Sequence, residues 1–166
     1  MTVTDQGAQE ADYLTLDQQL CFALSVASRS VISLYRPLLE PMGLTHPQYL
    51  VMVALWEHEP LSVREISSLL QLEPPTVSPV LKRLQSAGLI ERHRDASDER
   101  SVRLTLTPQG RALRDKAVKI PLQIVDRLGM SVPDLEALRS TLTHLIQHAQ
   151  GATSRSAAAP LPELQE

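Results

Sequence analysis

The chain has 166 residues, of which 43% are hydrophobic, and its net charge at neutral pH is −3. This length is sufficient for one domain with a proper core, and the low glycine and phenylalanine content suits a helical chain. No apolar run approaches the roughly 20 residues of a membrane span, and the polar N-terminus does not resemble a signal peptide. The single cysteine excludes an intrachain disulfide framework, so we expect a cytoplasmic protein.

The predicted elements begin after residues 1–14, which we expect to form a flexible N-terminus. Thr15 and Gln18 have the spacing of a capping box, the reciprocal side-chain cap of a helix start. Apolar residues at helical spacing predict that the helix continues to Tyr35. Pro37 is expected to end or kink this helix at the preceding residue.

A second helix is predicted between Pro47, near its first position, and Pro60, which closes it. Its strongly apolar face comprises Tyr49, Leu50, Val53, Ala54 and Trp56, and we interpret Trp56 as a core residue.

A short third helix follows, with Ser62 as its N-cap and Glu65 completing a second capping box. Its predicted buried side comprises Ile66, Leu69 and Leu70. Residues 72–74 then form a brief turn into the next helix. Two short helices joined in this way predict a helix-turn-helix unit.

The fourth helix has the clearest pattern in the chain. Pro74 and Pro75 lie in its first turn, where a missing N–H costs no hydrogen bond, and Gly88 stops it. One side is a buried stripe at helical spacing, formed by Val77, Val80, Leu81 and Leu84. The opposite side carries short hydrogen-bonding groups followed by cations, namely Thr76, Ser78, Lys82 and Arg83.

Two short strands are predicted at residues 89–94 and 102–106, joined by the polar segment 95–101. A helix followed directly by a charged β-hairpin is the pattern of a winged helix, so DNA binding is the first hypothesis. The sequence leaves open whether the strand residues Arg92, Arg94 and Arg103 contact DNA or are only exposed.

The charge distribution supports this hypothesis. Residues 61–116 hold ten Lys and Arg against seven Asp and Glu, a net charge of +3, whereas the rest of the chain carries −6. Phosphate binding requires a local basic surface more than a basic protein.

Thr107, followed by a proline, is predicted to cap a helix that reaches about Leu128 and bends at Pro121. A last helix is predicted to end at about Gln150. Residues 151–166, dominated by Ser, Ala and Pro, are predicted to be a disordered tail.

The predicted fold class is therefore mainly α with a small β-hairpin wing. A winged helix-turn-helix lobe at residues 61–107 lies between N-terminal helices at 15–60 and C-terminal helices at 108–150. The flanking helices are too long to be buried by so small a lobe, and their apolar stripes need a partner. We predict a symmetric homodimer with dimerisation helices at both ends of the chain.

Residues 95–102, followed by Leu-Thr-Leu-Thr and Gly110, resemble the wing signature of MarR-family transcriptional regulators. Four further segments resemble more specifically the organic-hydroperoxide-resistance branch of that family: residues 16–22, 35–39, 47–50 and 55–59. The resemblance covers residues 15–148. It implies a dimeric repressor that binds a palindromic operator in double-stranded DNA.

The resemblance also implies where DNA is contacted. The candidates for major-groove and phosphate contacts are Thr76, Ser78, Lys82 and Arg83. Arg100 matches the wing-tip arginine, which lies in the minor groove, where negative potential is concentrated, and Asp98 matches the aspartate that braces it. Pro74 and Pro75 depart from the small polar residue and glycine that the family usually has there.

Two interpretations of Cys21 are open from the residues alone. A lone cysteine between Leu20 and Phe22 is often a small core hydrophobe. Its place near the start of a capped helix instead favours an anionic, reactive sulfur. The resemblance implies the second interpretation, because the cysteine at this position is the peroxide sensor of the branch.

The resemblance further places tyrosines of the partner subunit near this thiol. Tyr35 matches one of them, whereas Ser25 and His46 stand where the family has two others. His46 can still offer a hydrogen bond or a charge. The oxidant is therefore open among fatty-acid hydroperoxides, smaller peroxides and hypochlorite.

The expected function is an oxidant-sensing repressor released from its operator when Cys21 is oxidised. Because the chain has no second cysteine, a stable disulfide requires an external low-molecular-weight thiol. Two alternatives remain: a MarR-type regulator of small aromatic ligands with a structural Cys21, and a winged helix that docks proteins. No nucleophile–base pair, phosphate loop or metal constellation indicates an enzyme, and no cofactor is expected.

Overall fold

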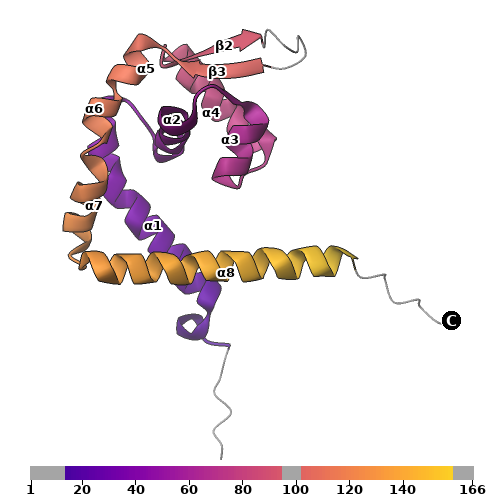
Figure 1. Ribbon diagram of the computed structural model, residues 1–166. Coiled ribbons are helices and arrows are strands. Elements are labelled where there is room, and N and C mark those ends of the chain that lie inside the picture. Colours follow the sequence, from indigo (N-terminus) through magenta and orange to yellow (C-terminus); the bar gives the residue numbers. More distant parts are fainter. Residues whose placement is uncertain (1–13, 95–101, 159–166) are drawn as a thin grey trace, which may run out of the picture. The chain divides into compact units, whose positions relative to one another are not determined.

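The computed structural model describes residues 14–94 and 102–158 (Figure 1), and the chain divides into two compact units, Met1–Pro121 and Leu122–Glu166. The elements in chain order are η1 (Leu16–Gln18), α1 (Leu20–Leu39), η2 (Glu40–Met42), α2 (His46–His58), β1 (Leu61–Ser62), α3 (Val63–Leu70), α4 (Pro74–Ser86), β2 (Ile90–Arg94), β3 (Val102–Leu106), α5 (Pro108–Ala112), α6 (Arg114–Ala117), α7 (Ile120–Leu128) and α8 (Val132–Ala158). The predicted fold class is confirmed.

The wing strands β2 and β3 pair antiparallel, in a three-stranded sheet of order β1-β3-β2. Ile90 lies opposite Leu106, and Arg94 lies opposite Val102. The strand β1 was not predicted, because two residues are too few to show the alternation of a strand. It closes the sheet by placing Leu61 opposite Leu104.

The predicted stripe of α4 is confirmed at three of its four positions, whereas Val80 is only half-buried. Val77, Leu81 and Leu84 are at most 1% exposed, and α4 packs on α2, α3 and β2. In α3 the prediction was partly wrong, because Leu69 is 49% exposed whereas Ser67 is buried beside Ile66. The small Ser67 side chain lies on the side of α3 that faces the core, and Leu69 is displaced to the flank of the helix.

The capping box of α3 is confirmed. The Ser62 N–H donates to Glu65 Oε2 (2.7 Å), and the Glu65 N–H donates to Ser62 Oγ (3.2 Å). The pKa of Glu65 is lowered, first of all by the bond from the Ser62 backbone. A similar bond runs from the Thr45 N–H to Gln48 Oε1 (2.7 Å) at the start of α2.

The capping box predicted at Thr15 and Gln18 was wrong. These residues belong to the 3-10 turn η1, and α1 begins at Leu20 with Gln19 as its N-cap. The Thr15 side chain hydrogen-bonds the Asp17 carboxylate instead, which lowers the pKa of Asp17.

Pro37 does not end α1, which continues to Leu39. A proline this close to the end of a helix removes only one backbone bond. The last turn is held by the N–H of Glu40, which donates to the Arg36 carbonyl, and by the burial of Leu39, which is 1% exposed.

The helix predicted from residue 108 to Leu128 is divided into α5, α6 and α7, although its Thr107 cap is confirmed by a bond from the Gly110 N–H (3.0 Å). Pro121 accounts for the break before α7, because it cannot donate to the Ala117 carbonyl. The end predicted for the last helix, Gln150, was also wrong, since α8 continues to Ala158. Gly151 weakens the helix only modestly, the alanines that follow favour it, and Pro160 is the first proline after Gln150.

No helix within residues 14–94 and 102–158 combines the length and the apolar character that crossing a membrane requires.

Candidate DNA-contacting surface and thiol site

The four predicted contact residues of α4 are all exposed, on the side opposite its buried stripe. The helical repeat separates them into two pairs: Ser78 and Lys82 on one edge, Thr76 and Arg83 on the other. The Ser78 hydroxyl donates to the Pro74 carbonyl (2.9 Å), so a nucleic acid would meet its oxygen as an acceptor.

The wing contributes an ion-paired arginine, Arg103, near the start of β3. Arg103 Nη1 lies 2.6 Å from Glu65 Oε2, the same oxygen that caps α3. This ion pair ties β3 to the start of the helix-turn-helix. The predicted wing-tip residues Asp98 and Arg100 lie outside the described residues.

Side chains at and just after the end of α2 hold the root of the wing, and their hydrogen-bond partners were not predicted from the sequence. Glu59 Oε2 accepts from the Leu106 N–H (2.8 Å), and the other Glu59 oxygen pairs with Arg111 of α5. Trp56 Nε1 donates to the Gly110 carbonyl (2.9 Å), so this residue is an anchor rather than only core. A partly buried tryptophan generally needs such a partner, which is the signal available before the structure.

A row of aromatic rings connects this anchor to α1. The ring centroids of Tyr35 and His46 are 5.0 Å apart in an edge-on arrangement, and Tyr35 and Tyr49 are 5.9 Å apart. Tyr49 in turn lies 6.5 Å from Trp56. The structure thus brings together the predicted Tyr35 and His46.

Burial sets the charge of these groups. It raises the pKa of Tyr35 and lowers the pKa of His46 below its ordinary value of 6.5. His46 is therefore neutral at pH 7 and offers a hydrogen bond rather than a charge.

Cys21 lies apart from this row within one chain. It is an exposed free cysteine in the first turn of α1, and its neighbours Leu20 and Phe22 are 61% and 41% exposed. Tyr35 lies almost four turns further along the same straight element, about 21 Å away at the usual rise per residue. Cys21 and Tyr35 can therefore meet only if they come from different copies of the chain.

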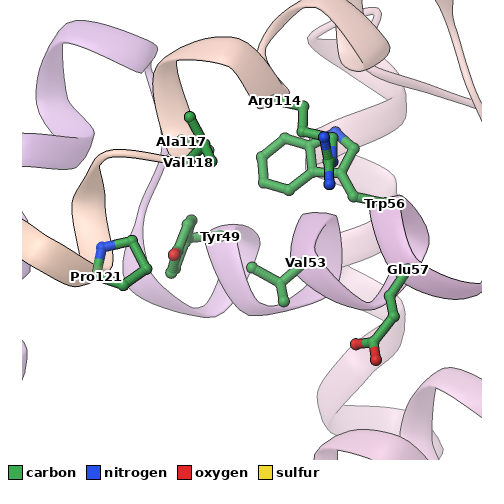
Figure 2. A pocket seen from close by; sticks show the side chains of 8 residues that line it. All are labelled: Tyr49, Val53, Trp56, Glu57, Arg114, Ala117, Val118 and Pro121. Atoms are coloured by element: carbon green, nitrogen blue, oxygen red, sulfur yellow. The ribbon is translucent and has the colours of Figure 1, made fainter.

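A cavity of about 320 Å³ lies beside the aromatic row (Figure 2). It is lined by Tyr49, Val53, Trp56, Glu57, Arg114, Ala117, Val118 and Pro121. Side chains of α2 face those of α6 across it, and the lining is mostly apolar with one arginine, Arg114, and one glutamate, Glu57. Such a lining suits a small aromatic acid. Within the described residues, no group of three or more His, Cys, Asp or Glu could hold a metal ion.

The fold and the exposed side of α4 are typical of winged-helix DNA-binding regulators. The MarR family model matches residues 44–102. The chain belongs to the MarR family, and its homologues are MarR-type DNA-binding transcriptional regulators rather than enzymes.

The chain is similar to one curated relative and to two solved structures over most of their lengths. The chain is 43% identical over 136 residues to the organic hydroperoxide resistance transcriptional regulator of Bacillus subtilis (strain 168), covering 82% of this chain and 92% of the relative. It is 35% identical to the structure of reduced AbfR bound to DNA (TM-score 0.63; 79% of this chain, 93% of that one). The structure of overoxidized AbfR bound to DNA is similar as well (35% identity; TM-score 0.61; 78% and 95% covered).

Proposed function

We propose that this protein is a cytoplasmic, oxidant-sensing repressor that leaves its operator when Cys21 is oxidised. The observation that carries the proposal is the place of Cys21: an exposed thiol in the first turn of α1, among exposed apolar side chains. The chain's own core does not contain Cys21, so the interpretation as a core hydrophobe of the single chain loses its support. The 43% sequence identity with a regulator of organic hydroperoxide resistance also supports oxidant sensing.

The proposal includes a homodimer. The exposed apolar residues of α1, namely Leu20, Phe22, Val26 and Ile32, need a cover, and so do Leu138 and Ile146 of α8. In the dimer, Cys21 of one copy meets Tyr35 and His46 of the other, and their hydroxyl and imidazole groups hydrogen-bond the sulfur. This composite site is the proposed sensor.

The chemistry has two steps. The Cys21 thiolate attacks the outer oxygen of a hydroperoxide; an S–O bond forms as the O–O bond breaks, and an alcohol leaves after taking up a proton. The sulfenic acid then reacts with a low-molecular-weight thiol, forming a mixed disulfide and releasing water. The added group forces the packing beneath the dimerisation helices apart, because packed interiors resist added volume.

On DNA, α4 enters the major groove with Thr76, Ser78, Lys82 and Arg83, and the wing reaches the adjacent minor groove with Arg100, which Asp98 braces. Two such lobes in one dimer should protect an inverted repeat with half-sites about one helical turn apart. Footprinting on an operator duplex checks this expectation. Protection of a single asymmetric half-site would contradict the dimeric arrangement, and absence of any salt-sensitive footprint would favour a protein-docking winged helix.

Arg100→Ala is expected to weaken operator binding by about 1–3 kcal/mol without unfolding the protein, as is usual for a specific arginine contact. Titration of a labelled operator at fixed salt measures the loss, and circular dichroism shows whether the fold is intact. Equal affinities at matched salt would remove Arg100 from the proposed contact set.

One observation favours a second candidate function, a regulator that responds to a small aromatic acid. The cavity of Figure 2 presents two aromatic rings and Arg114 to such a ligand. Release of the Cys21→Ser variant from DNA by an aromatic acid, at concentrations that leave an Arg114→Ala variant bound, would support this candidate.

A further inference from the structure

The three strand arginines whose role the sequence left open differ in their surroundings. Arg103 is engaged by Glu65 at 2.6 Å and braces the wing. Arg92 instead lines a groove between β2 and α4, together with Ser78, Pro79, Lys82 and Gln85. Arg94, at the end of β2, is exposed.

Strand geometry explains why Arg92 faces α4. Side chains of a strand alternate between two faces, so Arg92 shares a face with Ile90, which is 1% exposed. Arg92 also lies opposite Leu104, which is fully buried. This face of the sheet packs on α4, since α4 and β2 are in contact. Arg92 therefore lies at the rim of the core, in the angle between recognition helix and wing.

The donors in this groove suit an anion with several acceptor oxygens. Lys82 and Arg92 supply two cations from different elements and Gln85 adds an amide N–H donor, whereas the Ser78 hydroxyl, which donates to the Pro74 carbonyl, only lines the groove. Within the described part of the chain, no carboxylate lies at ion-pair distance from either cation. The nearest acidic residue in sequence, Glu91, points to the opposite face of the strand, where it pairs with His93 at 3.4 Å.

The geometry of a DNA duplex indicates which anion would lie in the angle between α4 and the wing. One sugar–phosphate strand separates a major groove from the adjacent minor groove. A protein that places a helix in the first and a wing in the second must straddle that strand, so the angle between helix and wing faces phosphates rather than base edges. An arginine there can bind two oxygens of one phosphate at once.

We propose that the groove formed by Ser78, Lys82, Gln85 and Arg92 binds the DNA phosphate backbone where it passes between α4 and the wing. The proposal rests on the DNA-binding function proposed above. It adds Arg92 and Gln85 to the contact surface and assigns Lys82 to phosphate rather than to bases.

The test compares Arg92→Ala, Lys82→Ala and the double variant with wild type on an operator duplex and on a scrambled duplex of equal length. Fluorescence anisotropy at several salt concentrations gives affinity and its salt dependence. Each lost phosphate contact is expected to weaken binding about fivefold at roughly 0.15 M salt. Both duplexes should be affected alike, and the slope of log K against log salt should become shallower by about 1 for each phosphate contact that the variant loses.

Lys116→Ala is the matched control, because Lys116 is an exposed cation of α6 outside the groove. It should leave the slope near that of wild type. Arg92→Lys, which keeps the charge, should retain most of the slope while losing part of the affinity, and it tests the site even where Arg92→Ala disturbs the wing.

The outcomes separate the two proposals. Failure of wild type to bind either duplex in a salt-dependent way would overturn both the groove and the DNA-binding function. Normal binding by wild type with unchanged slopes in Arg92→Ala and Lys82→Ala would overturn only the groove. A loss confined to the operator duplex would also overturn it, because it would show a base contact.

Discussion

Cys21→Ser is expected to bind the operator with wild-type affinity and to remain bound after peroxide treatment, whereas wild type is released. The serine hydroxyl keeps the size and polarity of the thiol but cannot become a sulfenic acid. In the presence of a small thiol, oxidised wild type should lose at least about tenfold in affinity, a change of roughly 1.4 kcal/mol. Gel-shift titration with cumene hydroperoxide, and separately with hypochlorite, measures both proteins.

Ser28→Ala provides the control, because Ser28 is an exposed residue of α1 outside the proposed sensor, and this variant should be released like wild type. If Cys21→Ser dissociates on oxidation as wild type does, Cys21 is not the sensor, and the aromatic-acid function takes its place.

Because the chain has no second cysteine, the same experiment also tests whether release requires an external thiol. Wild type treated with peroxide but without a small thiol is expected to leave DNA less completely, and intact-mass measurement should show sulfinic and sulfonic acids instead of a mixed disulfide. Full release without any thiol would show that the sulfenic acid alone opens the dimer.

Elements with a sequence pattern longer than a few residues could be predicted, whereas shorter patterns gave some wrong predictions. The stripe of α4 repeats over three turns and identified the helix and its buried side. Thr15 and Gln18 have a capping-box spacing too, yet no α-helix begins there, because the Thr15 side chain bonds Asp17 instead. A capping-box spacing does not by itself determine where a helix starts, because the same side chain can form another short-range hydrogen bond instead.

Other features depend on tertiary contacts that no local pattern contains. The exposure of Leu69 follows from where α2 and α4 pack on α3, and the strand β1 exists only because β3 offers an edge. In the candidate site, Tyr35 and His46 were predicted and lie together. The role of Arg92 could not be predicted, because it depends on the register of β2 against β3 and on the helix packed above them.

Gly110→Ala is expected to be among the most damaging single substitutions in the chain, although it adds only one methyl group. A Cβ at residue 110 would lie 2.1 Å from the Leu89 carbonyl oxygen and 3.1 Å from the Leu89 carbonyl carbon. The obstacle is backbone at the start of the wing, so no side-chain rotation relieves the overlap. The glycine is required here by a close approach rather than by an unusual backbone angle.

The surroundings of Gly110 prevent the first turn of α5 from retreating. The Thr107 N–H donates to the Leu89 carbonyl (3.1 Å), and the Thr107 hydroxyl donates to the Gly88 carbonyl (2.7 Å). The Trp56 indole bonds the Gly110 carbonyl (2.9 Å) from the other side. Relieving the overlap must therefore break at least one of these bonds.

Overpacking of this kind costs about 1–3 kcal/mol or more. In a chain of this size the melting temperature should fall by roughly 2–4 °C per kcal/mol. Operator affinity should fall as well, because the root of the wing moves relative to α4. Calorimetry at equal protomer concentration measures the stability, with Gln109→Ala as the control, since Gln109 is the exposed neighbour in the same turn of α5. A melting temperature and operator affinity equal to those of Gln109→Ala would show that α5 can shift freely, and that the wing root is not the rigid junction described above.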